Sequence, residues 1–187
     1  IQLSGGRDPH GPRRAVVVEE AGALPIVSAD PCYGACDLAI QEALSLGADL
    51  VIHFGHSSML SESELMPILF IEAKAALPLK PAVQKALPLL GAWNRIGLVT
   101  TVQHVGSLDD GRRALLAAGK TAAVGAAGRL HYAGQAIGCD YSNARAIAGA
   151  VDVVLCIGGG RFHASGVALA TSKPTIVVDR YEVRAYS

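Results

Sequence analysis

The chain has 187 residues, with 16 lysines and arginines balanced by 16 aspartates and glutamates, so it has no net charge to attract nucleic acid or an anionic membrane. It is 51% hydrophobic but only 5% aromatic and contains 21 glycines, a composition typical of α/β layers joined by tight turns. No apolar run reaches the roughly 20 residues of a transmembrane helix, and the first residues lack the layout of a signal peptide. We therefore expect a cytoplasmic protein that has no membrane segment and no direct contact with nucleic acid.

Short β-branched runs alternate along the chain with stretches of helical period, a pattern that predicts βαβ units and mostly parallel sheets. The predicted strands, in chain order, are 1–4, 25–29, 50–54, 68–71, 96–101, 122–125, 153–157 and 175–178. Pro78, Pro81 and Pro88 punctuate the segment between the fourth and fifth strands. Because proline is tolerated at helix ends rather than inside, we predict a linker helix over 81–95 that separates residues 1–80 from residues 96–187.

The two parts of the chain resemble each other when the sequence is shifted by 103 positions (139 minus 36). The shift places Cys36 on Cys139, and it aligns "LAIQEALSLGADLVIHFG" with "YSNARAIAGAVDVVLCIG". Both segments read as a helix, an acidic turn, a buried strand and a glycine. Upstream, each part has an Arg-Arg pair that opens a predicted helix, then a short strand and the cysteine loop. We therefore predict α/β architecture with two copies of one small doubly wound domain, the first containing Cys36 and the second Cys139.

Cys36 and Cys139 each precede an aspartate on a loop between a predicted strand and a predicted helix. Open α/β sheets place ligand groups on such loops, and a helix N-terminus favours the thiolate form that binds metal or attacks a substrate. Cys156 lies in an apolar strand, where the first copy has His53, and is predicted to be a small buried hydrophobe. Cys32 has no cysteine counterpart, and a role as a turn residue or as a second ligand from the same loop stays open.

The cysteine spacing lacks the C-x2-C pairs of structural zinc sites. Single cysteines from separate domains suit an iron–sulfur cluster at an interface, and a cluster with an open iron needs three thiolates, of which this chain visibly supplies two. In "HFGHSS", His53 and His56 could form a metal pair, but we favour a buried His53 and a His56 that faces the site. Asp37 and Asp140 are predicted to cap helices rather than to act as acids.

Four motifs, "ADPCYGACDLA", "VIHFGHSSM", "GQAIGCDYSNA" and "IGGGRFHASGVALAT", together resemble the diphthamide biosynthesis family in its archaeal type. The resemblance runs from about residue 24 to residue 179, apart from the linker. It implies three similar α/β domains that each supply one cysteine to a central [4Fe-4S] cluster, in a homodimer. It assigns two of these ligands to Cys36 and Cys139 and implies that the third domain is absent from this chain, as expected of a fragment.

The resemblance further implies a 2-(3-amino-3-carboxypropyl)histidine synthase, a transferase that is an unusual radical S-adenosylmethionine enzyme. Its reduced cluster would pass an electron to the sulfonium, and the 3-amino-3-carboxypropyl group would be added to a histidine of translation elongation factor 2. An electron donor is then a necessary partner. The residues expected to contact S-adenosylmethionine are His56, Gly158, Gly159, Gly160 and His163. The glycines let backbone N–H groups approach a ligand closely, and a tight strand-to-helix turn is the alternative explanation for them.

Two other functions stay open at this point. A non-catalytic partner subunit, which feeds electrons to a catalytic homologue or stabilises it, would fit a chain with only two of the three ligands. A generic doubly wound ligand-binding domain with incidental cysteines is the other. A third domain that carries a cysteine would favour the enzyme, and failure to assemble any cluster would favour the generic domain.

Overall fold

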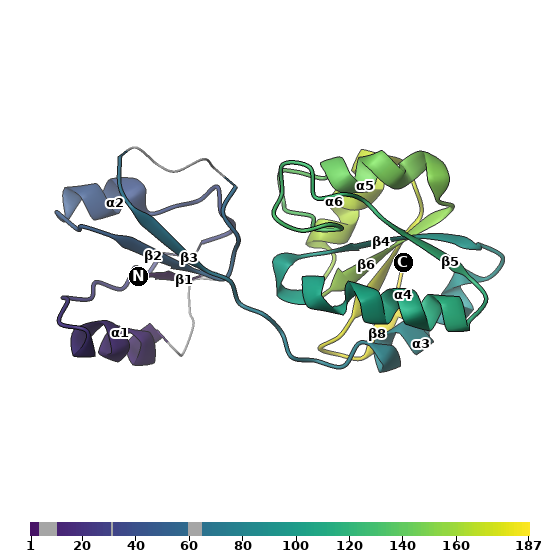
Figure 1. Ribbon diagram of the computed structural model, residues 1–187, viewed down its shortest axis with the longest axis horizontal. Coiled ribbons are helices and arrows are strands. Elements are labelled where there is room, and N and C mark those ends of the chain that lie inside the picture. Colours follow the sequence, from purple (N-terminus) through teal and green to yellow (C-terminus); the bar gives the residue numbers. More distant parts are fainter. Residues whose placement is uncertain (4–10, 31, 60–64) are drawn as a thin grey trace. The chain divides into compact units, whose positions relative to one another are not determined.

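The computed structural model describes residues 1–3, 11–30, 32–59 and 65–187, and the chain divides into two compact units, Ile1–Ala73 and Lys74–Ser187. Each unit combines helices with a sheet, and the strands are mostly parallel, as the sequence predicted (Figure 1). Within those four ranges, no helix has the length and apolar character needed to cross a membrane.

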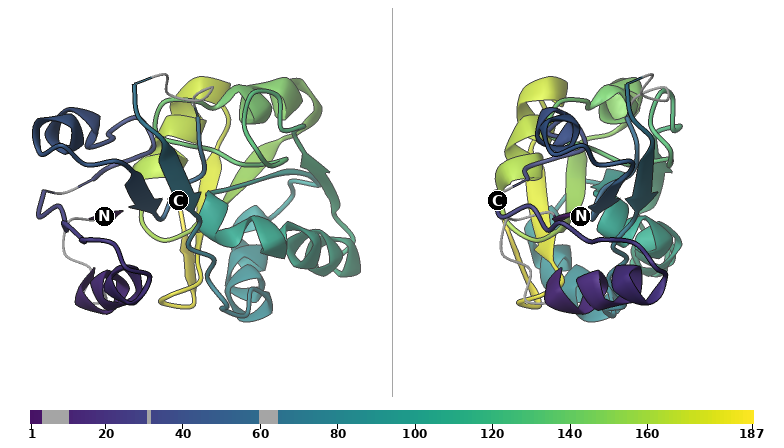
Figure 2. Two further views of the ribbon diagram at one scale, coloured as in Figure 1. Left: turned by 60° about the vertical axis from the view of Figure 1, so that its left-hand side comes forward. Right: turned by 90° about the vertical axis from the view of Figure 1, so that its left-hand side faces the viewer.

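The first unit contains a three-stranded parallel sheet in the order β1 (Gln2–Leu3), β2 (Val51–Phe54) and β3 (Ile68–Ile71). Helices α1 (Gly11–Glu20) and α2 (Ile40–Ser45) lie on opposite sides of this sheet (Figure 2). Along β2, Val51 and His53 are buried while the alternate residues are half-buried, so the central strand presents its two faces unequally. His53 pairs in register with Gln2 on one side and Phe70 on the other.

The second unit contains a five-stranded sheet in the order β5-β4-β6-β7-β8, with β8 antiparallel to β7 and all other pairs parallel. The strands are β4 (Arg95–Thr100), β5 (Thr121–Val124), β6 (Val153–Gly158), β7 (Thr175–Asp179) and β8 (Arg184–Tyr186). The helices are α3 (Lys80–Leu90), η1 (Val102–Ser107), α4 (Leu108–Ala117), α5 (Ser142–Ile147), η2 (Ala148–Ala150) and α6 (Phe162–Thr171). Helices α3 and α4 cover one face of the sheet, and α5 and α6 cover the other (Figure 1).

Alternating side chains of β4 and β6 build a core on each face of the second sheet. Leu98 and Leu155 point to α3 and α4 and are fully buried there. Val99 and Val154 point to the opposite face, where they pack with Val167 of α6. Because both faces are covered, these strands read as continuous apolar runs, which is why the sequence identified them.

One predicted strand, 25–29, is wrong. Ser28 donates its backbone N–H to Ile1 at 2.9 Å and the Ile1 amino group donates to the Ile26 carbonyl at 2.6 Å, but no ladder forms. Ile26 and Val27 stay 44% and 40% exposed, so the segment follows the edge of β1 without being buried by it. The other seven predicted strands are present, although Ser4 of the strand predicted over 1–4 lies outside the described residues. Strand β8 was not predicted.

The helix predicted over 81–95 corresponds to α3, which belongs to the second unit. Four of its residues, Ala82, Val83, Ala86 and Leu90, are buried in the core under the second sheet. Pro81 occupies the first turn, and Pro88 lies inside the helix near its end. The boundary between the units falls at residues 73 and 74, ahead of α3, because this helix packs on the second sheet.

Candidate active site

Parallel strands bring the loops that follow them to one edge of a sheet, and in open α/β sheets ligands bind where the strand order reverses. In the second unit this point lies between β4, which is followed by η1, and β6, which ends at Gly158. The predicted cofactor residues of this unit lie at the end of β6 and directly after it. The topology therefore places them where such folds bind ligands.

Cys36 lies in a tight turn ahead of α2. The Asp37 backbone N–H donates to the Gly34 carbonyl at 3.0 Å, and the Asp37 carboxylate accepts the Tyr33 N–H at 3.1 Å. These bonds fold the loop back on itself and leave the Cys36 thiol exposed. The prediction that Asp37 caps a helix is wrong, because its carboxylate closes the cysteine turn instead.

Cys139 is also exposed and lies in a turn closed by an isolated bridge between Ile137 and Asp140. The Asp140 carboxylate accepts the N–H of Ser142, the first residue of α5, at 2.7 Å, and pairs with Arg129 at 3.3 Å. Hydrogen bonding by Ser142, supported by the Arg129 charge, lowers the pKa of Asp140. Asp140 thus acts at the start of a helix, as predicted.

The other two cysteines are buried, and none of the four forms a disulfide. Cys156 is 4% exposed in β6, and burial raises the pKa of its thiol to about 12, which confirms its prediction as a small buried hydrophobe. Cys32 is 2% exposed, and its Sγ donates to the carbonyls of Gly34 and Asp37 at 3.4 and 3.3 Å. Burial raises the pKa of the Cys32 thiol as well.

Gln2, His53 and His56 form a chain of hydrogen bonds through the first unit. His53 Nδ1 lies 2.9 Å from Gln2 Oε1, and His53 Nε2 lies 2.9 Å from His56 Nδ1. His53 is fully buried, which confirms that part of its prediction, and burial lowers its pKa to about 4. His56 is half-buried, and burial lowers its pKa also.

The structure also brings Cys32 to this histidine pair, which no sequence motif indicated. One ligand atom from each of Cys32, His53 and His56 lies within 4.8 Å of the other two. The separation of 21 residues between the cysteine and the first histidine matches no familiar metal motif. The sequence alone therefore left the role of Cys32 undecided between a turn residue and a ligand.

The glycine loop after β6 favours glycine at two positions. A Cβ atom at Gly159 would lie 3.0 Å from the Tyr181 ring, and Gly160 has a φ of 76°, in the left-handed region. Gly158 is buried at the end of β6, and His163 is half-buried in the first turn of α6. The loop is therefore a tight strand-to-helix turn, and its two exposed glycines carry no side chain that would shield the backbone from a ligand.

A buried polar pair beside this loop had no sequence signal. His104 and Arg180 are 2% and 4% exposed, and Arg180 Nη1 lies 3.1 Å from His104 Nδ1 and 2.6 Å from Ser107 Oγ. Burial, reinforced by the Arg180 charge, lowers the pKa of His104 to about 4. The His104 ring meets the Tyr181 ring edge-on at 5.5 Å between centroids, so the pair supports the residue that packs over Gly159. The 76 residues between the partners explain why no motif revealed them.

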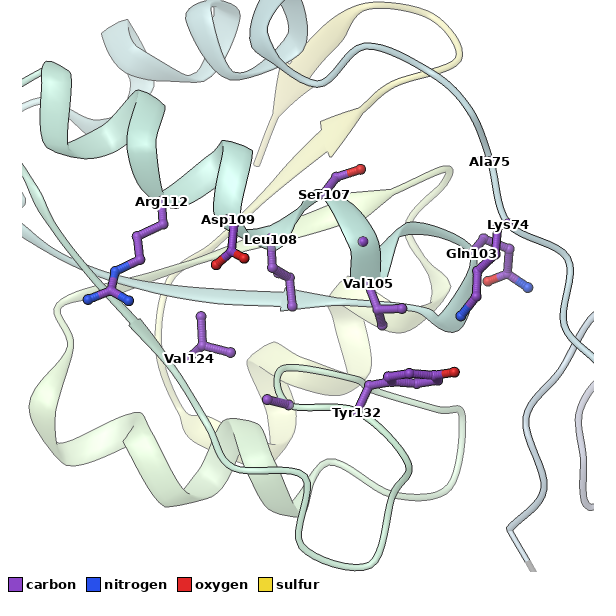
Figure 3. Close-up of a pocket in the computed structure, with 12 residues that line it drawn as sticks. Lys74, Ala75, Gln103, Val105, Ser107, Leu108, Asp109, Arg112, Val124 and Tyr132 are labelled. Atoms are coloured by element: carbon purple, nitrogen blue, oxygen red, sulfur yellow. The ribbon is translucent and has the colours of Figure 1, made fainter.

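A hollow of about 750 Å³ lies beyond the ends of β4 and β5, between η1, the start of α4 and the loop around Tyr132 (Figure 3). The Lys74 ammonium lies over the Tyr132 ring at 4.2 Å, and Asp109 and Arg112 line the α4 side. None of the predicted cofactor residues of this unit lines the hollow. The glycine loop and the hollow are therefore separate features.

Comparison with known proteins places these features in context. A family model of diphthamide synthesis proteins matches residues 9–187. The chain is 34% identical over 188 residues to the 2-(3-amino-3-carboxypropyl)histidine synthase of Pyrococcus horikoshii, covering 97% of this chain and 54% of that protein. It is 30% identical to subunit 1 of the synthase of Schizosaccharomyces pombe, covering 84% of this chain and 36% of that subunit.

Among solved structures, the crystal structure of Dph2 from Pyrococcus horikoshii with a 4Fe-4S cluster is similar, with a TM-score of 0.86 and 30% identity. The similarity covers 99% of this chain and 54% of that one. The chain thus spans about half the length of the Pyrococcus relative, and a smaller share of the yeast subunit.

Proposed function

This chain belongs to the family of diphthamide synthesis proteins, and on that premise we propose that it is part of a 2-(3-amino-3-carboxypropyl)histidine synthase. The enzyme would transfer the 3-amino-3-carboxypropyl group of S-adenosylmethionine to a histidine of translation elongation factor 2, in the first step of diphthamide synthesis. One observation carries the proposal: in a chain of this family, Cys36 and Cys139 are exposed thiols on loops directly ahead of helices.

Cys36 and Cys139 are the residues that would hold a [4Fe-4S] cluster. They are the two exposed cysteines, whereas Cys32 and Cys156 are buried. Their exposed thiols fit the donor chemistry of such a cluster, which takes cysteine thiolates. A third thiolate would come from a further domain. When bound and reduced, the cluster supplies the electron that breaks the carbon–sulfur bond of the sulfonium.

The two units are, in this proposal, two copies of one doubly wound domain. His53 in β2 pairs with strands on both sides, and Cys156 in β6 pairs with Val99 and Val177 in the same way. These two residues coincide under the shift of 103 positions (156 minus 53), the same shift that relates Cys36 to Cys139. A third copy in the complete protein would supply the remaining ligand.

The proposed contacts to S-adenosylmethionine are His56, Gly158, Gly159, Gly160 and His163. The bare backbone of the glycine loop and the N–H groups at the start of α6 favour an anionic group such as the methionyl carboxylate. The tasks of these residues would be to bind S-adenosylmethionine and to orient its sulfonium. The protein would act on elongation factor 2, receive electrons from a donor and form a dimer with a second copy of itself. Its location would be cytoplasmic.

The test uses the complete protein that contains this chain. We would reconstitute it anaerobically with iron and sulfide, reduce it with dithionite and record the electron paramagnetic resonance spectrum. The cluster signal should be lost in Cys36→Ala and in Cys139→Ala and should persist in Cys156→Ala, the matched control from the core. Equal signals in all three variants would contradict the ligand assignment.

Activity is measured separately, as transfer of label from the aminocarboxypropyl carbons of S-adenosylmethionine to elongation factor 2. Transfer by the protein alone supports the enzyme. A cluster without transfer, even in the presence of elongation factor 2 and reductant, would instead indicate the non-catalytic partner subunit.

A further inference from the structure

We propose that the first unit binds a zinc ion of its own through Cys32, His53 and His56, separate from the cluster that Cys36 would bind. One thiol and two imidazoles are ligands that zinc commonly takes, and three protein ligands leave a fourth position for water. Their ligand atoms already lie within 4.8 Å of one another. The site does not depend on the proposed function, although it would use Nδ1 of His56, a residue proposed above to contact S-adenosylmethionine.

Gln2 determines which ring nitrogen of His53 carries the proton. The Gln2 Nε2 group donates to the Asp37 carbonyl at 2.7 Å, and Gln2 Oε1 accepts the Ala39 N–H at 3.2 Å. Oε1 must therefore also accept from His53, whose Nδ1 lies 2.9 Å away and has to carry the proton. The lone pair of the neutral His53 ring then resides on Nε2, the nitrogen that faces His56.

This arrangement is the one that metal-bound histidines show in general. A histidine ligand donates its other ring N–H to an oxygen acceptor, which selects the tautomer and holds the ring in place. Here the acceptor is Gln2 Oε1, which is held in turn by the backbone of the cysteine loop. His53, which is buried, thus already has the hydrogen bond that usually supports a metal-bound histidine.

The distances require only small adjustments. A tetrahedral zinc ion with bonds of about 2.3 Å to sulfur and about 2.0 Å to nitrogen separates its ligand atoms by roughly 3.3–3.6 Å. His53 Nε2 and His56 Nδ1 would move apart slightly from 2.9 Å. Cys32 Sγ, which lies within 4.8 Å of one nitrogen of each ring, would approach them. Cys32 would give up weak bonds of 3.3 and 3.4 Å to two carbonyls, which its thiolate could not make.

The charge balance also favours a cation. Zinc with one thiolate has a residual charge of +1, and the Asp37 carboxylate belongs to the same turn as Cys32, where it accepts the Tyr33 N–H at 3.1 Å. Binding at neutral pH follows Zn²⁺ + Cys32–SH → Zn²⁺–⁻S–Cys32 + H⁺, because both imidazoles are already neutral. His56 only moves its proton from Nδ1 to Nε2. About one proton per zinc should therefore be released.

The second unit does not repeat this site. The shift that relates Cys36 to Cys139 places Gln135, Cys156 and Gly159 at the positions of the three ligands. Cys156 is buried in the core, and Gly159 has no ligand atom. The cysteine proposed for the cluster is therefore common to both units, whereas the histidine site belongs to the first unit alone. This difference separates the two metal sites by position and by chemistry.

The test titrates the 187-residue chain, after treatment with a chelator, with zinc and with Co²⁺ as a spectroscopic probe. Wild-type protein should bind one equivalent with thiolate-to-cobalt charge-transfer absorption and the d–d bands of a tetrahedral ion, and should release about one proton per zinc. Absence of the charge-transfer band in the folded wild type would overturn the proposal without recourse to any variant.

Variants locate the ion. Cys32→Ser should remove the charge-transfer band and His56→Gln should weaken binding at least tenfold, while the control Cys36→Ser should bind as the wild type does. Gln2→Ala should weaken zinc binding by about 10–100-fold, the usual effect of losing the partner of a histidine ligand. Circular dichroism checks that each variant is folded. Loss of binding in Cys36→Ser but not in Cys32→Ser would contradict the site and would leave the cluster assignment intact.

Discussion

The central strands of the two units, β2 and β6, occupy matching places in their sheets but are buried by different chemistry. All six residues of β6 are buried, and its neighbours form apolar cores on both faces. In β2 only Val51 and His53 are buried, and His53 is held by hydrogen bonds to Gln2 and His56. Neither α2 nor, apart from Gly11, α1 contributes a buried residue among those described.

The difference indicates that the two sheets are stabilised in two ways. Apolar burial holds the second unit, whereas a buried polar chain occupies the centre of the first. The free energy of apolar burial is non-directional and proportional to the buried area. A buried series of hydrogen-bonded side chains is stable only while every partner is present. The first unit should therefore respond to metal and the second to changes in side-chain volume, while a buried histidine in each unit should make both sensitive to acid. The predictions below test that division, from the largest expected effect to the smallest.

Shortening one side chain in each of the two central strands should lower the stability of the two units by unequal amounts. Leu155→Ala removes a fully buried side chain of β6 and should lower the free energy of unfolding of the second unit by about 2–5 kcal/mol. Ile52→Ala, at the matching position of the half-buried face of β2, should lower that of the first unit by roughly 1 kcal/mol. Hydrogen exchange followed by mass spectrometry reports both units. A larger effect of Ile52→Ala would contradict the division.

Acid should destabilise the second unit through His104. Its folded pKa is about 4, below the ordinary value of 6.5, because burial and Arg180 disfavour the charged ring. The unfolded chain therefore takes up a proton between these two values, and the stability present above pH 6.5 is lost as the pH falls towards 4. From pH 7 to pH 5 the loss should be about 2 kcal/mol.

Urea unfolding followed by the fluorescence of Trp93, the single tryptophan, measures this loss in the second unit. His104→Gln should flatten the pH dependence over the same interval. His53 in the first unit titrates in the same direction, with a folded pKa of about 4, so hydrogen exchange should show that unit losing stability in acid too. An unchanged slope in His104→Gln would show that another group is responsible.

A substitution in the glycine loop should change the stability of the second unit least. Gly160 has a φ of 76° and open space where a Cβ would lie, so Gly160→Ala should cost only the backbone strain of about 1–2 kcal/mol. Gly149→Ala also meets open space, but at an ordinary φ, and should leave the stability unchanged within about 0.5 kcal/mol. The first unit has Ser57 at the position of Gly160, so the strain is particular to the second unit. Equal midpoints in urea for the two variants would contradict the argument.

Much of the fold was predictable because buried parallel strands leave a strong signal. Apolar runs identified β4, β6 and β7, each of which is covered on both faces. The same signal misled at 25–29, where apolar residues lie exposed along an edge. It also missed β8, because Arg184–Tyr186 is a short edge strand with a charged residue and no apolar run. A sequence pattern reports the hydrophobicity of a segment but not the neighbours that bury it.

The site was predictable only where its residues are close in sequence. The turns around Cys36 and Cys139 and the glycine loop are local, and their residues revealed them. The contacts of Cys32 with the histidine pair and of His104 with Arg180 join residues 21 and 76 positions apart (53 minus 32, and 180 minus 104). Such partnerships are set by strand order, which no short motif encodes, so only the fold reveals them.

The last strand bears on solubility. An exposed sheet edge presents unpaired N–H and C=O groups that invite another chain to add a strand, and natural proteins protect such edges with short, charged strands. β8 covers the edge of β7 with only three residues, and the guanidinium groups of Arg161 and Arg184 lie over its Tyr186 ring at 5.0 and 4.9 Å. Two cationic side chains thus lie over the ring of an edge-strand residue, a feature that disfavours the approach of another strand along β8.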